Sequence, residues 1–169
     1  MNELLLQLRV LPSEYVCLGT GVDMDNVAYA EESYRDLWVA AFTTAGVKGN
    51  AMRAGYDAAT KYEVDGEFLD VGTINIILIT NASLTDAAMA RALITITEAK
   101  VAALQDLDVR SSYNQSYQAT GTGTDNVVIV SGNGIKVTYT GGHAKAGELI
   151  ARAVLESVKE AVKKGGNYA

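Results

Sequence analysis

Two short segments of the chain place a carboxylate directly after a glycine-rich turn. They read Gly19-Thr20-Gly21-Val22-Asp23 and Gly121-Thr122-Gly123-Thr124-Asp125. Glycine permits backbone conformations and close ligand approach that a side chain would block. Asp125 could activate a water molecule, and the amide hydrogens of the second turn could stabilise a developing oxyanion. The two segments therefore predict binding loops, although Asp125 could equally serve only to stabilise its own turn.

His143 is the only histidine, and it follows two glycines at the start of an expected helix. Histidine is the side chain that ionises near neutral pH, and the positive end of a helix dipole favours its neutral form. His143 is therefore a candidate general base that Asp125 could orient. A capping or core histidine is the structural alternative.

Thr122 and Thr124 are weaker candidates, because an internal threonine needs an adjacent base to become a nucleophile. If a pseudo-twofold axis relates the two glycine turns, Asp23 and Asp125 could also approach each other. Neighbouring carboxylates differ in their affinity for a proton, which would give one of them an acid role.

The bulk properties predict one folded domain over residues 1–169. Hydrophobic residues make up 49% of the chain and charged residues 20%, as in ordinary globular proteins. The net charge of −6 disfavours binding to nucleic acid or to anionic membranes. No apolar run is long enough to span a bilayer, so we expect a cytoplasmic protein. One cysteine and one histidine cannot build a zinc cluster, and we expect no metal and no cofactor.

The elements that must position these residues follow an order of strands, helix, strands, helix. Apolar stretches predict strands at 27–30, 37–43 and 73–80, the first two joined as a hairpin. Ser83 and Asp86 have the spacing of a capping box before a helix that runs to about residue 107. A second amphipathic helix spans about 145–164 and ends at Gly165-Gly166. This order favours an α+β fold, with a mixed or mainly antiparallel sheet and packed helices, over a doubly wound fold.

A second hairpin is expected from strands at 126–130 and 135–139 around Asn133-Gly134, because Asn-Gly favours tight hairpin turns. Each glycine turn would then lead into a strand pair. The chain therefore reads as a possible degenerate internal repeat.

Together, these segments resemble the adenosylcobinamide amidohydrolase family over about residues 16–165. The likeness rests on residues 118–125 and on five further segments, which are Thr44-Ala45-Gly46-Val47, Arg53-Ala54-Gly55, Gly72-Thr73-Ile74-Asn75-Ile76, Thr97-Glu98-Ala99-Lys100 and Gly141-Gly142-His143. The resemblance implies hydrolysis of the amide between aminopropanol and the corrinoid side chain of adenosylcobinamide. It also implies a small-molecule corrinoid as the partner, with catalysis assigned to His143, Asp125, Thr122 and Thr124.

Substrate contacts are expected from the glycines of the second turn and from four polar residues, which are Asp23, Asn50, Arg53 and Asn75. Arg53 could also bind a substrate phosphate. Relative to the family pattern, the chain begins close to the first glycine turn, and Ala144 and Ala146 replace expected residues beside His143. A shortened chain could leave a sheet edge or an apolar patch open, so we expect a homo-oligomer, in particular a dimer. A non-catalytic corrinoid-binding protein and a hydrolase of another amide remain open alternatives.

Overall fold

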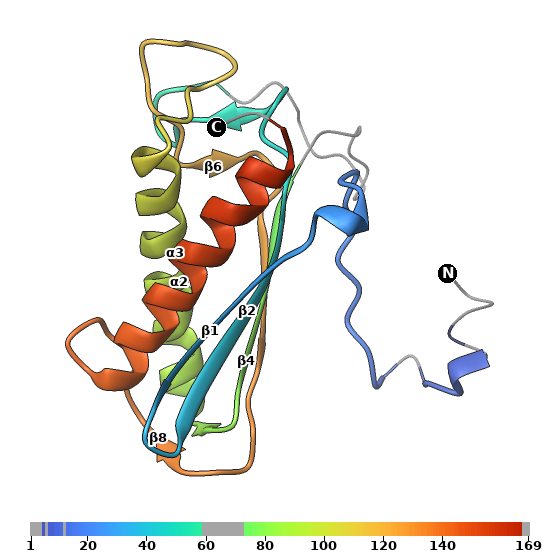
Figure 1. Cartoon of the computed structure of the whole chain (residues 1–169), viewed down its shortest axis with the longest axis vertical. Coiled ribbons are helices and arrows are strands. Elements are labelled where there is room, and N and C mark those ends of the chain that lie inside the picture. Colours follow the sequence, from blue (N-terminus) through green and yellow to red (C-terminus); the bar gives the residue numbers. More distant parts are fainter. Residues whose placement is uncertain (1–4, 6, 12, 59–72, 167–169) are drawn as a thin grey trace.

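A four-stranded sheet forms the centre of the molecule (Figure 1). The computed structural model describes residues 5, 7–11, 13–58 and 73–166. The sheet has the spatial order β1 (Ala28–Tyr34), β2 (Leu37–Ala45), β4 (Ile74–Thr80) and β7 (Asn126–Val130). The first three strands are antiparallel, whereas β7 runs parallel to β4. A mixed sheet with helices packed on it confirms the α+β prediction.

The β1–β2 hairpin is confirmed, with Ala28 opposite Thr43 and Tyr34 opposite Leu37. Two residues, Arg35 and Asp36, connect the strands, and Arg35 has a φ of 55°. A positive φ is what the tight turns of two-residue hairpins require. This hairpin supplies the edge of the sheet against which the second long helix packs.

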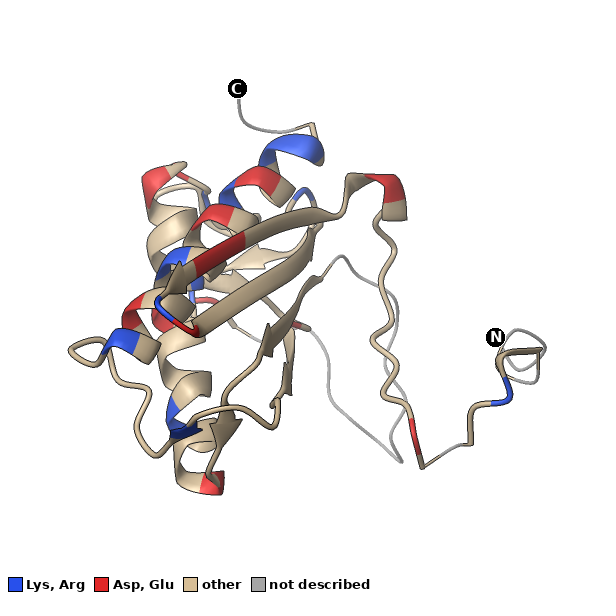
Figure 2. Ribbon diagram, turned by 60° about the horizontal axis from the view of Figure 1, so that its bottom comes forward, with Lys and Arg blue, Asp and Glu red and all other residues tan. Residues whose placement is uncertain are grey.

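Two long helices, α2 (Asp86–Asp106) and α3 (Lys145–Lys164), lie on one face of the sheet (Figures 1 and 2). Their small and branched side chains share one core with alternate residues of β2 and β4. The buried hydroxyls of Thr43 and Ser157 form a hydrogen bond of 2.8 Å, which ties α3 to β2. The expected capping box is wrong in detail. Thr85 is the N-cap of α2, and its hydroxyl accepts a hydrogen bond from the Ala88 amide, because Ser83 belongs to a short strand.

The expected hairpin over residues 126–139 is wrong. β7 pairs with β4, and β8 (Lys136–Val137) instead runs parallel to β5 (Ser83–Leu84). The glycines of this turn serve close packing: a Cβ on Gly132 would lie 2.5 Å from the carbonyl oxygen of Asn81, and one on Gly134 would lie 2.6 Å from it. Tertiary pairing with a distant segment therefore replaces the local turn. The structure consequently does not confirm an internal repeat.

A smaller sheet joins β3 (Ala51–Met52) to β6 (Gly121–Thr122) in antiparallel register. It brings the loop after β2 against the second glycine turn. A short 3-10 helix, η1 (Met24–Asn26), follows the first glycine turn and leads into β1. Both glycine turns therefore precede a strand, but only the first leads into a hairpin, so the expected strand pair after the second turn is wrong.

The face of the sheet opposite the helices is mainly apolar and partly exposed, with Glu31 of β1 as a charged residue beside Tyr29. Alternation along β2, β4 and β7 directs a second set of side chains away from the core. Tyr29 is 52% exposed, Ile77 37% and Val130 44%. No charged residue occurs in β2, β4 or β7. Among the described residues, no helix is long and apolar enough to cross a membrane.

Candidate functional site

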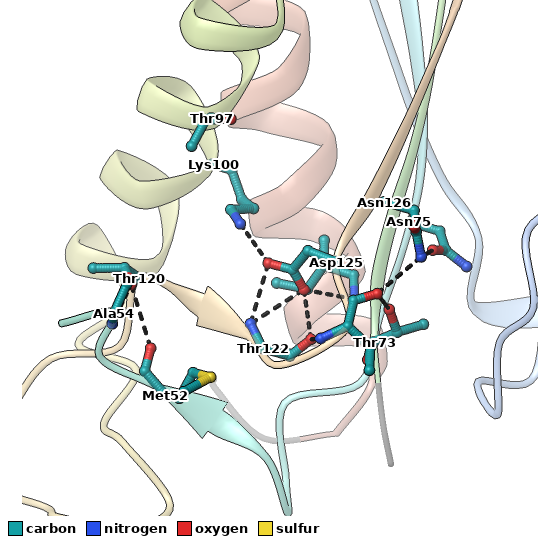
Figure 3. A network of polar contacts seen from close by, with 12 residues as sticks. Met52, Ala54, Thr73, Asn75, Thr97, Lys100, Thr120, Thr122, Asp125 and Asn126 are labelled. Atoms are coloured by element: carbon teal, nitrogen blue, oxygen red, sulfur yellow. Dashed lines mark hydrogen bonds and ion pairs between the residues drawn. The ribbon is translucent and has the colours of Figure 1, made fainter. Parts of the chain in front are cut away.

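Asp125 is the centre of a polar cluster at the end of the sheet where β4 and β7 begin (Figure 3). Its carboxylate accepts hydrogen bonds from the Ile74 amide at 3.1 Å, the Thr122 amide at 3.1 Å and the Thr122 hydroxyl at 2.5 Å. It also forms an ion pair with Lys100 of α2. Four donors from three separate elements therefore fix the position of this carboxylate.

The ion pair between Lys100 and Asp125 is largely buried. The two side chains are only 12% and 15% exposed. Lys100 reaches the cluster past Gly121, where a Cβ would lie 2.2 Å from Asp125 Oδ2 and 2.6 Å from Lys100 Nζ. Glycine at position 121 is therefore required for the close approach of the two charges. The sequence interpretation did not assign Lys100 a role, although its segment carries part of the family resemblance.

Asn75 joins the two glycine turns. Its side-chain amide donates a hydrogen bond of 2.7 Å to the carbonyl oxygen of Gly19, and its side-chain oxygen accepts one of 3.4 Å from Asn126. The first turn thus lies beside the residue that follows Asp125. Asp23 itself caps η1 through a hydrogen bond from the Asp25 amide. The described hydrogen bonds give the carboxylates of Asp23 and Asp125 no shared partner.

The remaining predicted residues of the second turn lie in the same cluster. The carbonyl oxygen of Thr124 accepts a hydrogen bond of 2.5 Å from the Thr73 hydroxyl, which holds the turn to the start of β4. Position 123 is close to the side chain of Met52, since a Cβ on Gly123 would lie 3.6 Å from its sulfur. Asn50 is buried and directly precedes β3.

Arg53 follows β3 and lies on the outer side of the small sheet. Its guanidinium donates a hydrogen bond of 3.3 Å to the carbonyl oxygen of Gln118, and the Ala54 amide donates one of 3.0 Å to the Thr120 hydroxyl. The Arg53 turn is therefore fixed to the segment 118–120, which leads into β6. Asn50 and Arg53 thus flank β3, which pairs with β6 of the second glycine turn, while the Arg53 side chain contacts Gln118.

His143 lies away from this cluster, at the other end of α3. It precedes the N-terminus of α3, whereas a Cβ on Gly165, at the C-terminus of α3, would lie 3.1 Å from the carbonyl oxygen of Ala45. Ala45 pairs with Ile74, whose amide binds Asp125. His143 and the Asp125 cluster are thus near opposite ends of α3, which has 20 residues and a length of about 30 Å. Within one chain, Asp125 therefore does not orient His143.

His143 is exposed, and its ring lies 5.1 Å from the ring of Tyr139. Ala144, not His143, is the N-cap residue of α3. Among the described residues, no three histidine, cysteine, aspartate or glutamate side chains come together as potential metal ligands.

Comparison with known proteins assigns the chain to a family. The profile of the adenosylcobinamide amidohydrolase family matches residues 1–168. The chain belongs to this family.

Two relatives match most of the length of this chain. An uncharacterized protein of Methanocaldococcus jannaschii is 51% identical over 96% of the chain and 68% of its own length. An adenosylcobinamide amidohydrolase of Methanosarcina mazei is 31% identical over 88% of the chain and 66% of its own length. The matched region thus spans about two thirds of each relative.

The Asp125 cluster contains a carboxylate and an ammonium group, two groups that can take part in amide hydrolysis. A carboxylate can accept a proton from water, and an ammonium group can stabilise an oxyanion or protonate a leaving amine. The Thr122 hydroxyl donates its proton to Asp125, so that its oxygen lone pairs face away from the carboxylate. The cluster could therefore support attack by water on an amide carbonyl.

Proposed function

We propose that this chain hydrolyses the amide bond between aminopropanol and the corrinoid side chain of adenosylcobinamide, releasing adenosylcobyric acid. The observation that carries the proposal is the family match over residues 1–168. The relative from Methanosarcina mazei, named an adenosylcobinamide amidohydrolase, supports it. The gathering of the predicted polar residues around Asp125 is consistent with an active site at that end of the sheet.

In this proposal Asp125 accepts a proton from the attacking water while the oxygen of that water bonds to the amide carbon. Lys100 stabilises the oxyanion, and the carbon–nitrogen bond breaks as protonated Asp125 returns the proton taken from water to the leaving amine. Thr122 is a positioning residue, because its hydroxyl and amide both hold Asp125. The corrinoid would lie against the two glycine turns and Asn75.

A non-catalytic corrinoid-binding protein is the alternative that a specific observation favours. Both carboxylate oxygens of Asp125 already accept hydrogen bonds from protein groups. Such saturation is also typical of a carboxylate that only stabilises a loop. Binding and hydrolysis must therefore be measured separately.

The experiment is incubation of the purified chain with adenosylcobinamide, followed by chromatography and mass analysis of both free and protein-bound corrinoid. We expect adenosylcobyric acid to accumulate in proportion to the amount of protein. Retention of intact adenosylcobinamide on the protein, without product, would instead support the binding protein. Absence of both binding and product would contradict a corrinoid function.

We also propose that the chain forms a homodimer in which the open sheet face contacts a second copy. That face is mainly apolar, with exposed Tyr29, Ile77 and Val130, and it contains Glu31 of β1, which accepts a hydrogen bond from the Tyr29 hydroxyl. The segment before η1 projects from the body (Figures 1 and 2) and exposes Leu8 and Val16. Apolar patches of this kind are typical of protein–protein interfaces.

For the dimer, we expect size-exclusion chromatography with light scattering to give about twice the chain mass of 17.9 kDa. Ile77→Lys is expected to shift the mass to that of one chain, because a charge on the open face would be buried in the dimer. Leu93→Lys is the matched control, since Leu93 is an exposed apolar residue on α2. A wild-type monomer, or an Ile77→Lys variant that remains dimeric, would contradict the proposed interface.

A further inference from the structure

A cavity of about 430 Å³ lies beside the small sheet, on the side of Arg53. It is bounded by the turn after β3 and by the loop between α2 and β6. Its described walls are formed by Arg53, Tyr56, Arg110, Ser116, Tyr117 and Gln118. None of these side chains contributes to the Asp125 cluster, so the cavity is a separate feature of the molecule.

The described walls of this cavity contain two arginines and no carboxylate, in a chain whose net charge is −6. Two acids among the described residues contact these wall residues without lining the cavity. Asp57 accepts hydrogen bonds of 2.6 Å from the Arg53 amide and from the Ser111 hydroxyl. Asp108 accepts a hydrogen bond from the side chain of Gln118 and forms an ion pair with Arg110. Both contacts lower the pKa of Asp108, and the hydrogen bond from Gln118 has the larger effect.

Each guanidinium uses only some of its N–H donors in the described contacts. The described partner of Arg53 is the Gln118 carbonyl oxygen, and that of Arg110 is Asp108. A guanidinium has five N–H donors in a planar fork, which matches the geometry of phosphate and carboxylate oxygens. Two such groups on the wall of one cavity favour an anion with several acceptor oxygens.

An aromatic pair provides the second recognition surface. The rings of Tyr56 and Tyr117 pack 4.9 Å apart at an interplanar angle of 54°. The guanidinium of Arg53 lies 5.7 Å from the centre of the Tyr56 ring. Tyrosine faces offer apolar contact to an organic group while the adjacent cations bind its charge.

The two loops that form the cavity are held in place by hydrogen bonds. Ser111 accepts hydrogen bonds from the Tyr113 and Asn114 amides while its own hydroxyl donates to Asp57. Gly55, in the turn that contains Arg53, has a φ of 82°, which favours glycine. The cavity is therefore largely formed before a ligand arrives, which reduces the entropic cost of binding.

We propose that this cavity binds the phosphate ester of a small organic molecule, with the phosphate between Arg53 and Arg110 and the organic group against Tyr56 and Tyr117. Arginine is the preferred residue for bidentate phosphate recognition. The proposal concerns binding at a site distinct from the Asp125 cluster, and it holds whether or not the chain hydrolyses adenosylcobinamide.

Isothermal titration calorimetry with phenyl phosphate and phenol tests the proposal. We expect phenyl phosphate to bind at least about tenfold more tightly than phenol, which corresponds to about 1.4 kcal/mol. Arg53→Gln and Arg110→Gln are each expected to remove this preference. Arg152→Gln is the matched control, because Arg152 is an exposed arginine on α3 that pairs with Glu148. Circular dichroism verifies that each variant is folded.

Equal binding of phenyl phosphate and phenol, or no binding of either, would overturn the proposal. An equal loss in the Arg152→Gln variant would also overturn it, because the effect would then reflect overall charge. Competition experiments against bound phenyl phosphate show which kind of phosphate ester the cavity prefers. Displacement of phenyl phosphate by adenosylcobinamide phosphate, but not by adenosylcobinamide, would identify a phosphorylated corrinoid as the ligand. Displacement by neither would identify a separate phosphate ester.

Discussion

Replacement of Asp125 by asparagine is expected to lower the rate of adenosylcobinamide hydrolysis by about 100-fold or more, the usual size of a general-base contribution. Asparagine has nearly the same shape but cannot accept the proton. It also leaves Lys100 as a largely buried charge without its counter-ion. We therefore expect a loss of about 3–5 kcal/mol in the free energy of unfolding as well. Initial rates and urea denaturation curves measure the two effects.

The double variant Lys100→Met with Asp125→Asn separates catalysis from stability. Removal of both charges avoids an uncompensated buried ion, so much of the lost stability is expected to return. If the cluster is catalytic, the stable double variant remains inactive. Recovery of activity together with stability would show that the ion pair is only structural.

His143→Ala is the control for these variants, because His143 is exposed at the far end of α3. We expect its rate to remain within about threefold of the wild-type rate, in line with a surface substitution away from the chemistry. A loss of 100-fold or more in this variant would place the chemistry at the start of α3 and would contradict the assignment to Asp125.

Gly147→Ala is expected to destabilise the protein by about 2–3 kcal/mol, although alanine in a helix interior is normally about 1 kcal/mol better than glycine. A Cβ at this position of α3 would lie 2.1 Å from the carbonyl oxygen of Gly141 and 2.5 Å from that of Thr140. These are backbone atoms, so α3 itself must move. Thermal unfolding is expected to show a midpoint about 5–10 °C lower.

Gly142→Ala is the matched control for Gly147→Ala. A Cβ on Gly142 would meet no atom within 4 Å, and this glycine does not have a positive φ. We expect its unfolding midpoint to stay close to that of the wild type, within about 0.5 kcal/mol of stability. A Gly147→Ala variant as stable as this control would contradict the tight packing of α3 against residues 140–141.

The elements that could be predicted from the sequence are those whose signals are local. The β1–β2 hairpin, β4 and the two long helices each have a periodic pattern within their own residues. The strand pair expected around Asn133-Gly134 failed because β7 and β8 find their partners in β4 and β5. An Asn-Gly pair predicts a turn, but it does not identify the strand with which the following residues pair.

The candidate site was predictable in part for the same reason. The second glycine turn has a local pattern, and the structure brings Asn126, which follows it, together with Asn75. The distance from Asp125 to His143 depends on the direction of α3, which no local pattern gives. Lys100 had a usable signal, because it lies four residues from both Ile96 and Leu104 on the buried stripe of α2. A cation on such a stripe needs a buried partner.

The parallel pairing of β4 with β7 also affects how quickly the protein folds. Asn75 pairs with Asn126, 51 residues further along the chain, whereas β1 and β2 close through a two-residue turn. Closing a long loop costs chain entropy before any contact compensates it, so distant strand pairs form slowly. Because Asn75 also binds Gly19, three regions of the sequence must meet before the two glycine turns are complete. A nascent or truncated chain that has not reached β7 therefore lacks the contact between Asn75 and Asn126, however well its first hairpin has folded.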